Sequence, residues 1–284
     1  MNQVVFVKLA FLCQQKGMAF KLLLAIFLVS FHLVSIAQPV SYDELKEVVY
    51  TNNTDAYSVE RCKLDFYYPK GSKDFVTVIW FHGGGLTAGD REIPEALKGK
   101  NIAVVGAGYR LSPKASVLEI LNDAADVVKW TFDHVEKYGG SKDNIIIGGY
   151  SAGAYLALML GLDSTYLNSR SLKTSDLLGI VSFSGQAITH FTARNEMNVP
   201  EFQPVINELA PLYWVRKDAP PILLVTGDRN MEMMGRYEEN AYLLRMLKLV
   251  GHSTSVLYEL EGYDHSMTFP AYPILLKTIR KWTN

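Results

Sequence analysis

The stretch "NIIIGGYSAGAYLALMLGL", residues 144–162, decides the fold. Its first part is an apolar run typical of a buried β-strand, and its last part is long and apolar enough for a buried helix. Ser151 stands at the junction, between Gly149 and Gly153. A strand that turns at once into a helix presents such a serine at the carboxyl end of a sheet, above the helix N-terminus. The stretch therefore predicts Ser151 as a nucleophile, and the alternative is an ordinary small residue packed at the end of a strand.

Strand-like and helix-like segments alternate on both sides of this stretch. We expect further strands at 61–69, 75–84, 101–111, 176–185, 220–228 and 254–262, and further helices at 117–138, 237–252 and 271–282. This alternation is typical of an α/β protein with a mostly parallel sheet covered by helices on both faces. The segment 61–69, "RCKLDFYYP", is a candidate for an early antiparallel strand. No internal repeat or linker divides the chain, which predicts a single domain over 38–284.

The composition excludes some classes of partner. The chain has 284 residues, of which 49% are hydrophobic, and a formal net charge of −1. It has no dense block of Lys and Arg, so we expect no nucleic-acid partner and no anionic membrane partner. Small neutral or mildly charged ligands fit this charge balance.

The N-terminal segment differs from the rest. In "FKLLLAIFLVSFHLVSIAQ", residues 20–38, a lysine precedes an apolar run that ends in small residues. This pattern predicts a signal peptide over 1–37 with cleavage after Ala37, and a secreted or periplasmic mature protein. An uncleaved membrane anchor is disfavoured because the run from Leu22 to Val34 is shorter than the roughly 20 residues of a spanning helix. The true start is either Met1 or Met18.

Cysteine content and residue spacing give no sign of a disulfide, metal or cofactor. Cleavage of the leader leaves only Cys62, which lies in a strand-like stretch and is expected to be buried. No group of His, Asp and Cys has the spacing of metal ligands, and acyl transfer by a serine needs no cofactor. We therefore expect no disulfide, no metal and no cofactor.

A serine nucleophile needs donors for the negative charge that develops on its substrate. The segment "FHGGG", residues 81–85, follows a predicted strand, and its glycines leave backbone N–H groups accessible. The N–H of Ala152, next to the nucleophile, is a further donor. A phosphate-binding turn is the alternative, but the Lys-Ser or Lys-Thr of a P-loop does not follow.

The nucleophile also needs a base, for which we choose His265. It lies in "GYDHSM", residues 262–267, directly after the last predicted strand. His82 precedes the nucleophile in the chain, which is the wrong order for this architecture, and is expected to tie its loop. His134, His190 and His252 are expected to be surface or partly buried polar residues.

These motifs together resemble the α/β-hydrolase superfamily. "HGGG", "GYRLSP" (108–113), "GYSAG", "PPILLVTGD" and a late "DH" occur in the order found in hormone-sensitive-lipase-like esterases and the related feruloyl and acetyl-xylan esterase (BD-FAE-like) and kynurenine formamidase group. The resemblance runs from about residue 60 to the end. It implies an eight-stranded, mostly parallel sheet and acyl transfer through a serine ester. It also implies an oxyanion hole formed by Gly84, Gly85 and Ala152, with Gly83 as an alternative to Gly85.

The triad acid departs from that pattern. In the resembling families a carboxylate occupies the third position after the glycine that corresponds to Gly227, and here that residue is Asn230. Asp228 is our first choice because it ends the strand, although an aspartate there could instead cap the loop. Glu232 is the second choice, followed by Asn230 itself or another carboxylate. A carboxylate both orients the imidazole and stabilises its charge, whereas an amide mainly orients it.

The function expected from the sequence is that of an exported serine esterase. Its substrate would be a small acyl ester or a carbohydrate-linked acetyl or feruloyl ester, an expectation that rests on the resemblance. The segment Gln186–Asp218 is expected to form a lid or a wall of the acyl pocket. Its aromatic residues could stack on an aromatic or sugar ring of the substrate, or could instead simply pack the insertion; they are Phe191, Phe202, Tyr213 and Trp214. A peptidase or amidase on the same scaffold, and a catalytically silent fold used for binding, are the alternatives.

Overall fold

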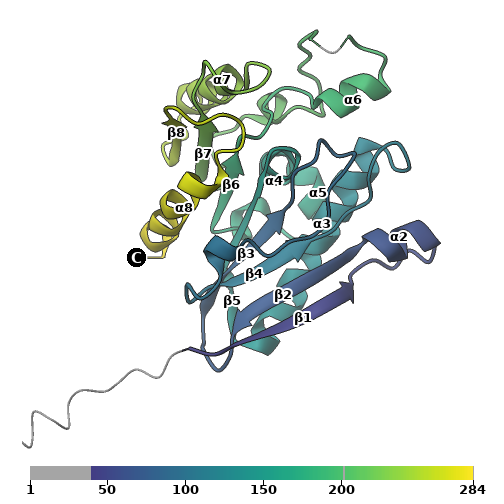
Figure 1. Ribbon diagram of the computed structural model, residues 1–284, viewed down its shortest axis with the longest axis vertical. Helices are drawn as coiled ribbons and strands as arrows, with labels where there is room; N and C mark the ends of the chain where they lie inside the picture. The colour runs from purple at the N-terminus through teal and green to yellow at the C-terminus, as the bar shows by residue number, and fades with distance from the viewer. Residues whose placement is uncertain (1–39, 201, 284) are drawn as a thin grey trace, which may run out of the picture. The chain divides into compact units, whose positions relative to one another are not determined.

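A computed structural model describes residues 40–200 and 202–283, which form one unit built on a twisted eight-stranded sheet (Figure 1). The predicted signal peptide and its cleavage point lie outside these residues. The strands are β1 (Tyr42–Val49), β2 (Lys63–Pro69), β3 (Phe75–Phe81), β4 (Ala103–Ala107), β5 (Gly140–Tyr150), β6 (Gly179–Phe183), β7 (Ile222–Gly227) and β8 (Ser255–Leu260). In the part of the chain that the structure describes, no helix has the length and apolar character needed to cross a membrane.

The strand order is β1-β2-β4-β3-β5-β6-β7-β8. β2 runs antiparallel to β1 and β4, and every other neighbouring pair is parallel. The predicted mostly parallel sheet is therefore confirmed, as is the antiparallel direction of the early strand. The strands from β3 to β8 end at one edge of the sheet, which is where parallel α/β proteins place their sites.

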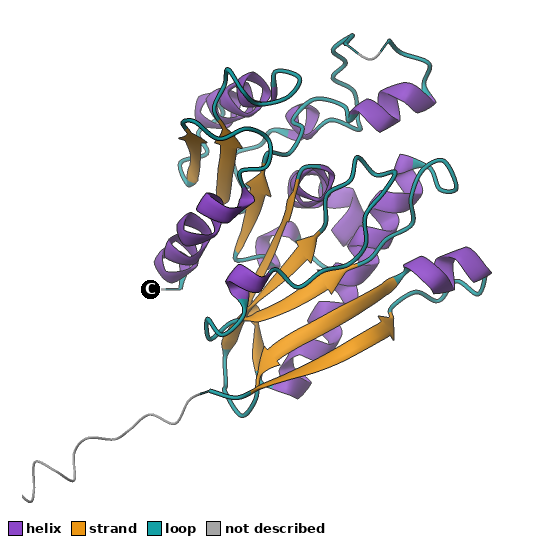
Figure 2. Cartoon of the chain, in the orientation of Figure 1, coloured by secondary structure: helices purple, strands orange, loops and turns teal. Residues whose placement is uncertain are grey.

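Helices cover both faces of this sheet (Figure 2). The α-helices are α2 (Ala56–Arg61), α3 (Val117–His134), α4 (Ala152–Leu162), α5 (Ser164–Asn168), α6 (Phe191–Glu196), α7 (Arg236–Leu249) and α8 (Thr268–Trp282). Short 3-10 turns are η1 (Glu95–Leu97), η2 (Val135–Tyr138), η3 (Thr174–Asp176) and η4 (Pro211–Trp214). Apolar side chains of α3, α4 and α7 pack in a large core on one face, and those of α8 and η1 pack in a smaller core on the other.

The structure adds elements that the sequence pattern did not predict. β1 is an edge strand whose side chains are mostly exposed or half-buried, so it lacks a long apolar run. The helices α2, α5 and α6 have five or six residues each, too few for a clear helical period. The helix expected over 117–138 divides into α3 and η2 and ends at Gly139, whose φ of 97° is left-handed.

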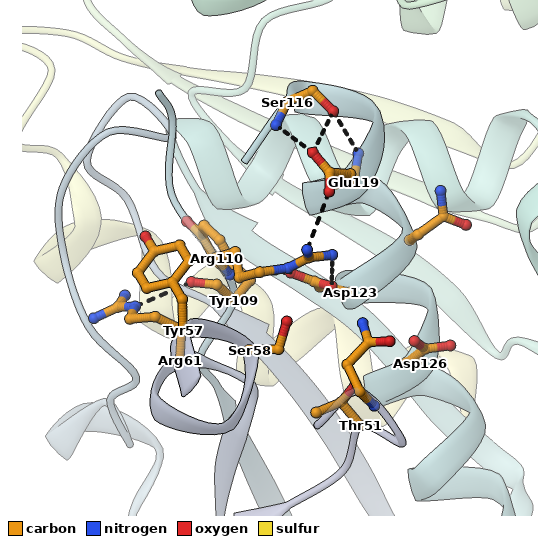
Figure 3. A network of polar contacts seen from close by, with 12 residues as sticks. Thr51, Tyr57, Ser58, Arg61, Tyr109, Arg110, Ser116, Glu119, Asp123 and Asp126 are labelled. Atoms are coloured by element: carbon orange, nitrogen blue, oxygen red, sulfur yellow. Dashed lines mark hydrogen bonds and ion pairs between the residues drawn. The ribbon is translucent and has the colours of Figure 1, made fainter. Parts of the chain in front are cut away.

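A polar network fixes the loop between β4 and α3 (Figure 3). The Arg110 guanidinium donates to both carboxylate oxygens of Asp123, at 2.9 and 2.8 Å, and to Glu119 at 3.1 Å. Asp123 is 2% exposed, so this ion pair is largely shielded from water. The loop is also joined to the glycine loop after β3, because the Ser112 N–H donates to the Leu86 carbonyl at 2.8 Å. The "GYRLSP" motif thereby braces the glycine loop that follows β3.

Candidate active site

Ser151 occupies a sharp turn between β5 and α4. Its φ of 53° and ψ of −114° form a strained conformation for a residue with a side chain. The turn is held because the Ser151 N–H donates to the Phe183 carbonyl at 2.8 Å. A Cβ on Gly149 would lie 2.6 Å from the Phe81 carbonyl oxygen, and one on Gly153 would lie 2.0 Å from the same atom. The two glycines are therefore needed because the turn packs directly on β3.

His265 lies within hydrogen-bonding distance of this serine. It lies in the loop between β8 and α8, and its Nε2 is 2.9 Å from Ser151 Oγ. Its Nδ1 is 2.5 Å from Glu232 Oε1. Since an ionised carboxylate only accepts hydrogen bonds, Nδ1 carries the hydrogen and Nε2 presents its lone pair to the hydroxyl. Tyr150 helps to hold the loop, because its hydroxyl donates to the His265 carbonyl at 3.0 Å.

The carboxylate of Glu232 is fully enclosed and fully hydrogen-bonded. Its side chain is 1% exposed. Oε1 accepts from His265 Nδ1 and from the Met233 N–H at 3.0 Å. Oε2 accepts from the Ser184 hydroxyl and from the Gly227 N–H at 3.0 Å. Two donors on each oxygen use the full acceptor capacity of the carboxylate, which fixes it in one orientation.

These hydrogen bonds keep Glu232 ionised despite its burial. Burial by itself raises the pKa of a carboxyl group. The hydrogen bonds from His265 and Ser184 more than offset this effect and lower the pKa of Glu232 from 4.5 to about 2. Glu232 is therefore negatively charged at neutral pH, as a group facing an imidazolium should be.

The structure thus brings the second-choice acid to His265 rather than the first choice. Asp228 accepts from the backbone N–H groups of Asn230 at 2.8 Å and Gly262 at 3.0 Å, which is the loop-capping role considered as its alternative. Asn230 is exposed and its side chain donates to Asp228, so it does not contact the imidazole. Instead of contacting His265, Asp228 joins the loop after β7 to the loop that carries His265.

A single turn of chain explains why Glu232 reaches the site. The Glu232 N–H donates to the Asp228 carbonyl at 2.8 Å, which closes one helical turn directly after β7. This turn brings the side chain back toward the Gly227 N–H. Gly227 also allows the histidine loop to approach, because a Cβ there would lie 2.5 Å from the carbonyls of Tyr263 and Asp264. The longer glutamate side chain thus substitutes for an aspartate two residues earlier.

The glycine loop lies beside the serine turn. β3 and β5 are parallel neighbours in which Phe81 pairs with Gly149, so the two loops leave the sheet together. Gly84 and Gly85 have φ values of 112° and 64°, which favour glycine. Among the residues placed by the structure, no protein acceptor takes the backbone N–H of Gly84, Gly85 or Ala152. These three donors remain available to a substrate oxygen.

His82 has a structural position in this loop, as its place in the sequence indicated. Its ring stacks on Tyr109 with centroids 4.2 Å apart, and its Nδ1 donates to the Gly83 carbonyl at 2.6 Å. The Tyr109 hydroxyl donates to the His82 carbonyl at 2.7 Å. Burial lowers the pKa of His82 to about 4, so it is neutral at neutral pH.

The other histidines that the structure describes contact other parts of the fold. The ring of His134 contacts the Trp130 carbonyl, and the ring of His190 accepts from the Thr192 N–H. The ring of His252 contacts the carbonyls of Ala219 and Pro220. None of these contacts involves Ser151. No set of three or more His, Cys, Asp or Glu residues within 40–200 and 202–283 is arranged to hold a metal ion.

The insertion after β6 contacts the glycine loop. Thr192 Oγ1 donates to the Gly85 carbonyl at 2.6 Å, and the Phe191 ring lies where a Cβ on Gly85 would be only 2.9 Å away. Phe191 therefore borders the donors of the glycine loop. Phe202 and Tyr213, also proposed from sequence as pocket residues, are 79% and 57% exposed.

Sequence reasoning missed Ser184. Its hydroxyl donates to Glu232 Oε2, and its Oγ lies 3.2 Å from His265 Nδ1. Its only sequence signal is its place directly after a buried strand that neighbours the strand of the nucleophile, which is too weak to single out one serine.

The strand order, the strained serine turn and the serine–histidine–carboxylate contacts define the α/β-hydrolase fold class. The family model for BD-FAE matches residues 64–235, which is more than half of the chain. The chain belongs to the BD-FAE family.

Three curated relatives with similar sequences are named as ester hydrolases. The chain is 32% identical over 102 residues to a probable isoprenylcysteine alpha-carbonyl methylesterase, ICMEL1, of Arabidopsis thaliana, covering 34% of this chain and 21% of the relative. It is 29% identical over 100 residues to the carboxylic ester hydrolase LipN of Mycobacterium tuberculosis, covering 33% and 27%. It is 28% identical over 114 residues to the acetyl esterase of Salmonella choleraesuis, covering 38% and 34%. The matches thus span only about a fifth to a third of these relatives.

Solved structures share the fold. A carbohydrate esterase from gut microbiota superposes with a TM-score of 0.70 at 16% identity, covering 87% of this chain and 98% of that one. Esterase B of Lactobacillus rhamnosis superposes with a TM-score of 0.68 at 18% identity, covering 95% and 96%. At these identities the likeness establishes the fold.

Proposed function

We propose that the protein is an exported serine esterase that hydrolyses a carboxylic ester through an acyl-enzyme on Ser151. The observation that carries the proposal is the continuous chain of contacts from Ser151 Oγ to His265 Nε2 and from His265 Nδ1 to Glu232. The esterase relatives, among them the acetyl esterase, support the same activity. The substrate we propose is a small acyl ester or a carbohydrate-linked acetyl or feruloyl ester, and the likeness to a carbohydrate esterase supports that choice.

The reaction follows from the geometry in two halves. Ser151 Oγ attacks the ester carbonyl carbon while its proton passes to His265 Nε2, and the carbonyl oxygen gains a negative charge. The N–H groups of Gly84, Gly85 and Ala152 stabilise that oxyanion, and Glu232 stabilises the imidazolium. His265 then gives its proton to the departing alcohol, which leaves an ester on Ser151. Water, deprotonated by His265, attacks this ester and releases the carboxylic acid and Ser151.

Covalent labelling tests the nucleophile. A fluorophosphonate probe should label the native protein, and Ser151→Ala should abolish both labelling and ester turnover. Labelling that persists in Ser151→Ala would refute the assignment. A protein that binds esters without labelling or turnover would instead be a silent fold used for binding, although a complete serine–histidine–glutamate set removes the main reason to expect this.

A substrate panel tests the ester class. We expect p-nitrophenyl acetate and butyrate to be hydrolysed with higher kcat/KM than long-chain esters, and acetylated or feruloylated oligosaccharides to be cleaved. Faster cleavage of peptide or anilide substrates would favour a peptidase or amidase. Export is tested separately by the N-terminal sequence of the secreted product, which we expect to begin at Gln38 after cleavage behind Ala37.

A further inference from the structure

Ser184 stands at the point where the acid and the base of the site meet. β6 lies between β5, which carries the nucleophile, and β7, which precedes the acid. Ser184 directly follows β6 and is fully buried. Its hydroxyl donates to Glu232 Oε2, and its Oγ lies 3.2 Å from His265 Nδ1. A single side chain therefore contacts both partners of the imidazole–carboxylate hydrogen bond.

The hydrogen of this hydroxyl has only one useful direction. Glu232 is ionised and accepts hydrogen bonds, so Ser184 donates to it and turns a lone pair toward His265 Nδ1. Two acceptors, Glu232 Oε1 and Ser184 Oγ, then face the same ring nitrogen. This favours the tautomer with hydrogen on Nδ1, which is the one that leaves Nε2 free to take the proton of Ser151.

The backbone of Ser184 has an unfavourable conformation that is held in place by hydrogen bonds. Its φ of 54° is left-handed, which is uncommon for a residue with a side chain. The Ser184 N–H donates to the Val225 carbonyl at 2.8 Å, and the Arg236 guanidinium donates to the Ser184 carbonyl. Both backbone polar groups are thus fixed, so the side chain has little freedom to turn away.

Arg236 makes this support costly for the fold. It is 1% exposed, and it occupies the first position of α7, where the helix dipole disfavours a cation. Within the described part of the chain, its Nε and Nη2 atoms have no hydrogen-bond partner. The Arg236 guanidinium nevertheless donates to the Ser184 carbonyl, and its charge is favoured by the nearby carboxylates of Glu239 and Glu232.

We propose that Ser184 is a positioning residue that holds Glu232 and selects the reactive tautomer of His265. This inference rests on the proposed esterase function. Loss of one hydrogen bond to a buried carboxylate corresponds to a decrease in kcat of about 10- to 100-fold. KM should be unchanged, because Ser184 is fully buried.

Two variants separate the hydroxyl from the backbone strain. Ser184→Ala removes the hydroxyl and keeps the strain, whereas Ser184→Gly removes the hydroxyl and relieves the strain. We expect the same loss of kcat in both variants, and a higher melting temperature for Ser184→Gly than for Ser184→Ala. Ser182→Ala is the matched control, since Ser182 is a buried serine two residues earlier, within β6, and its kcat should stay within about twofold of wild type. Wild-type kcat in Ser184→Gly would overturn the proposal.

A double variant tests whether Ser184 acts through Glu232. If it does, Ser184→Ala should have little further effect on kcat in a Glu232→Gln background, because the carboxylate that it holds is already gone. A full multiplicative loss would overturn the proposal that Ser184 acts by holding Glu232.

A proton spectrum gives a readout that does not depend on turnover. The hydrogen on His265 Nδ1 should give a far-downfield resonance in the wild type that shifts or broadens in Ser184→Ala and is unchanged in Ser182→Ala. An unchanged resonance in Ser184→Ala would contradict the role of Ser184. Ester turnover that persists in Ser151→Ala would refute the proposed mechanism through Ser151, whereas Ser151-dependent turnover with wild-type kcat in Ser184→Ala would refute only this inference.

Discussion

Replacing Glu232 by glutamine should disable the base while keeping the shape of the side chain. The carboxylate accepts two fixed backbone N–H groups, that of Met233 on Oε1 and that of Gly227 on Oε2. A glutamine amide has an NH₂ group on one side, so in either orientation a buried donor faces a backbone donor. If the NH₂ faces Met233, it also faces His265 Nδ1 and favours the tautomer whose Nε2 cannot accept the serine proton.

The magnitude follows from these two effects. One unsatisfied buried donor pair lowers the free energy of unfolding by about 1–3 kcal/mol. Loss of the negative charge beside the imidazolium, together with the wrong tautomer, lowers kcat by about 10³- to 10⁴-fold in enzymes with this type of triad. That decrease corresponds to about 4–5.5 kcal/mol of transition-state stabilisation.

The assay compares two variants on p-nitrophenyl acetate. Glu232→Gln should show the large loss of kcat, whereas Asp228→Asn should stay within about tenfold of wild type because Asp228 acts on the loop and not on the imidazole. Chemical denaturation of each variant shows that it is folded. More than a tenth of wild-type kcat in Glu232→Gln, or an equal loss in Asp228→Asn, would refute the assignment of the acid.

The stability difference between wild type and Glu232→Gln should depend on pH. The pKa of Glu232 is lowered from 4.5 to about 2, so the stability that its ionised form contributes is fully present above about pH 4.5 and is lost as the pH falls through 2. Glutamine does not titrate. The difference in unfolding free energy should therefore shrink as the pH is lowered across this window, and a difference that is constant with pH would contradict the lowered pKa.

Three further predictions concern the scaffold. Gly149→Ala should lower the free energy of unfolding by about 3 kcal/mol or more in chemical denaturation, because its Cβ would lie 2.5 and 2.6 Å from backbone atoms. Gly71→Ala, whose Cβ would have no atom within 4 Å, should lower it by only about 1–2 kcal/mol. Equal decreases for the two variants would contradict the packing argument. Asp123→Asn should lower the free energy of unfolding by about 2–3 kcal/mol, because the largely buried Arg110 guanidinium then keeps only the more exposed carboxylate of Glu119 as a charged partner. Asp133→Asn, which breaks an exposed ion pair, should change it by less than about 1 kcal/mol. Burial raises the pKa of the Cys62 thiol to about 12, so the native thiol should react slowly with iodoacetamide at pH 8. Peptide mapping should find Cys62 modified only in unfolded protein, and rapid modification of the native protein would contradict this.

Much of the fold was predictable because its signals are local. Apolar runs marked the strands from β3 to β7, and the 3.6-residue period marked α3 and α8. β1 and the short helices were not predicted, since their residues are largely exposed or too few to form a period. These elements are defined by what they pack on, and a single sequence does not display those contacts.

The sequence by itself determined the sharp turn that carries Ser151. Gly149 and Gly153 flank Ser151 because no side chain fits at the turn, and this steric requirement is visible in the order of residues. The choice of His265 was also possible from sequence, because it follows the last strand and parallel strands end at one edge of the sheet.

Only the tertiary structure decided which carboxylate faces the imidazole. Asp228, Asn230 and Glu232 lie within five residues of one another, and a sequence does not show which side chain a turn directs inward. The helical turn after β7 directs Glu232 to the Gly227 N–H, while Asp228 is used by the loop. The contact of Ser184 with both partners likewise depends on strands that are distant in sequence and adjacent in the sheet, because side-chain hydrogen bonds are set by distances in space and not along the chain.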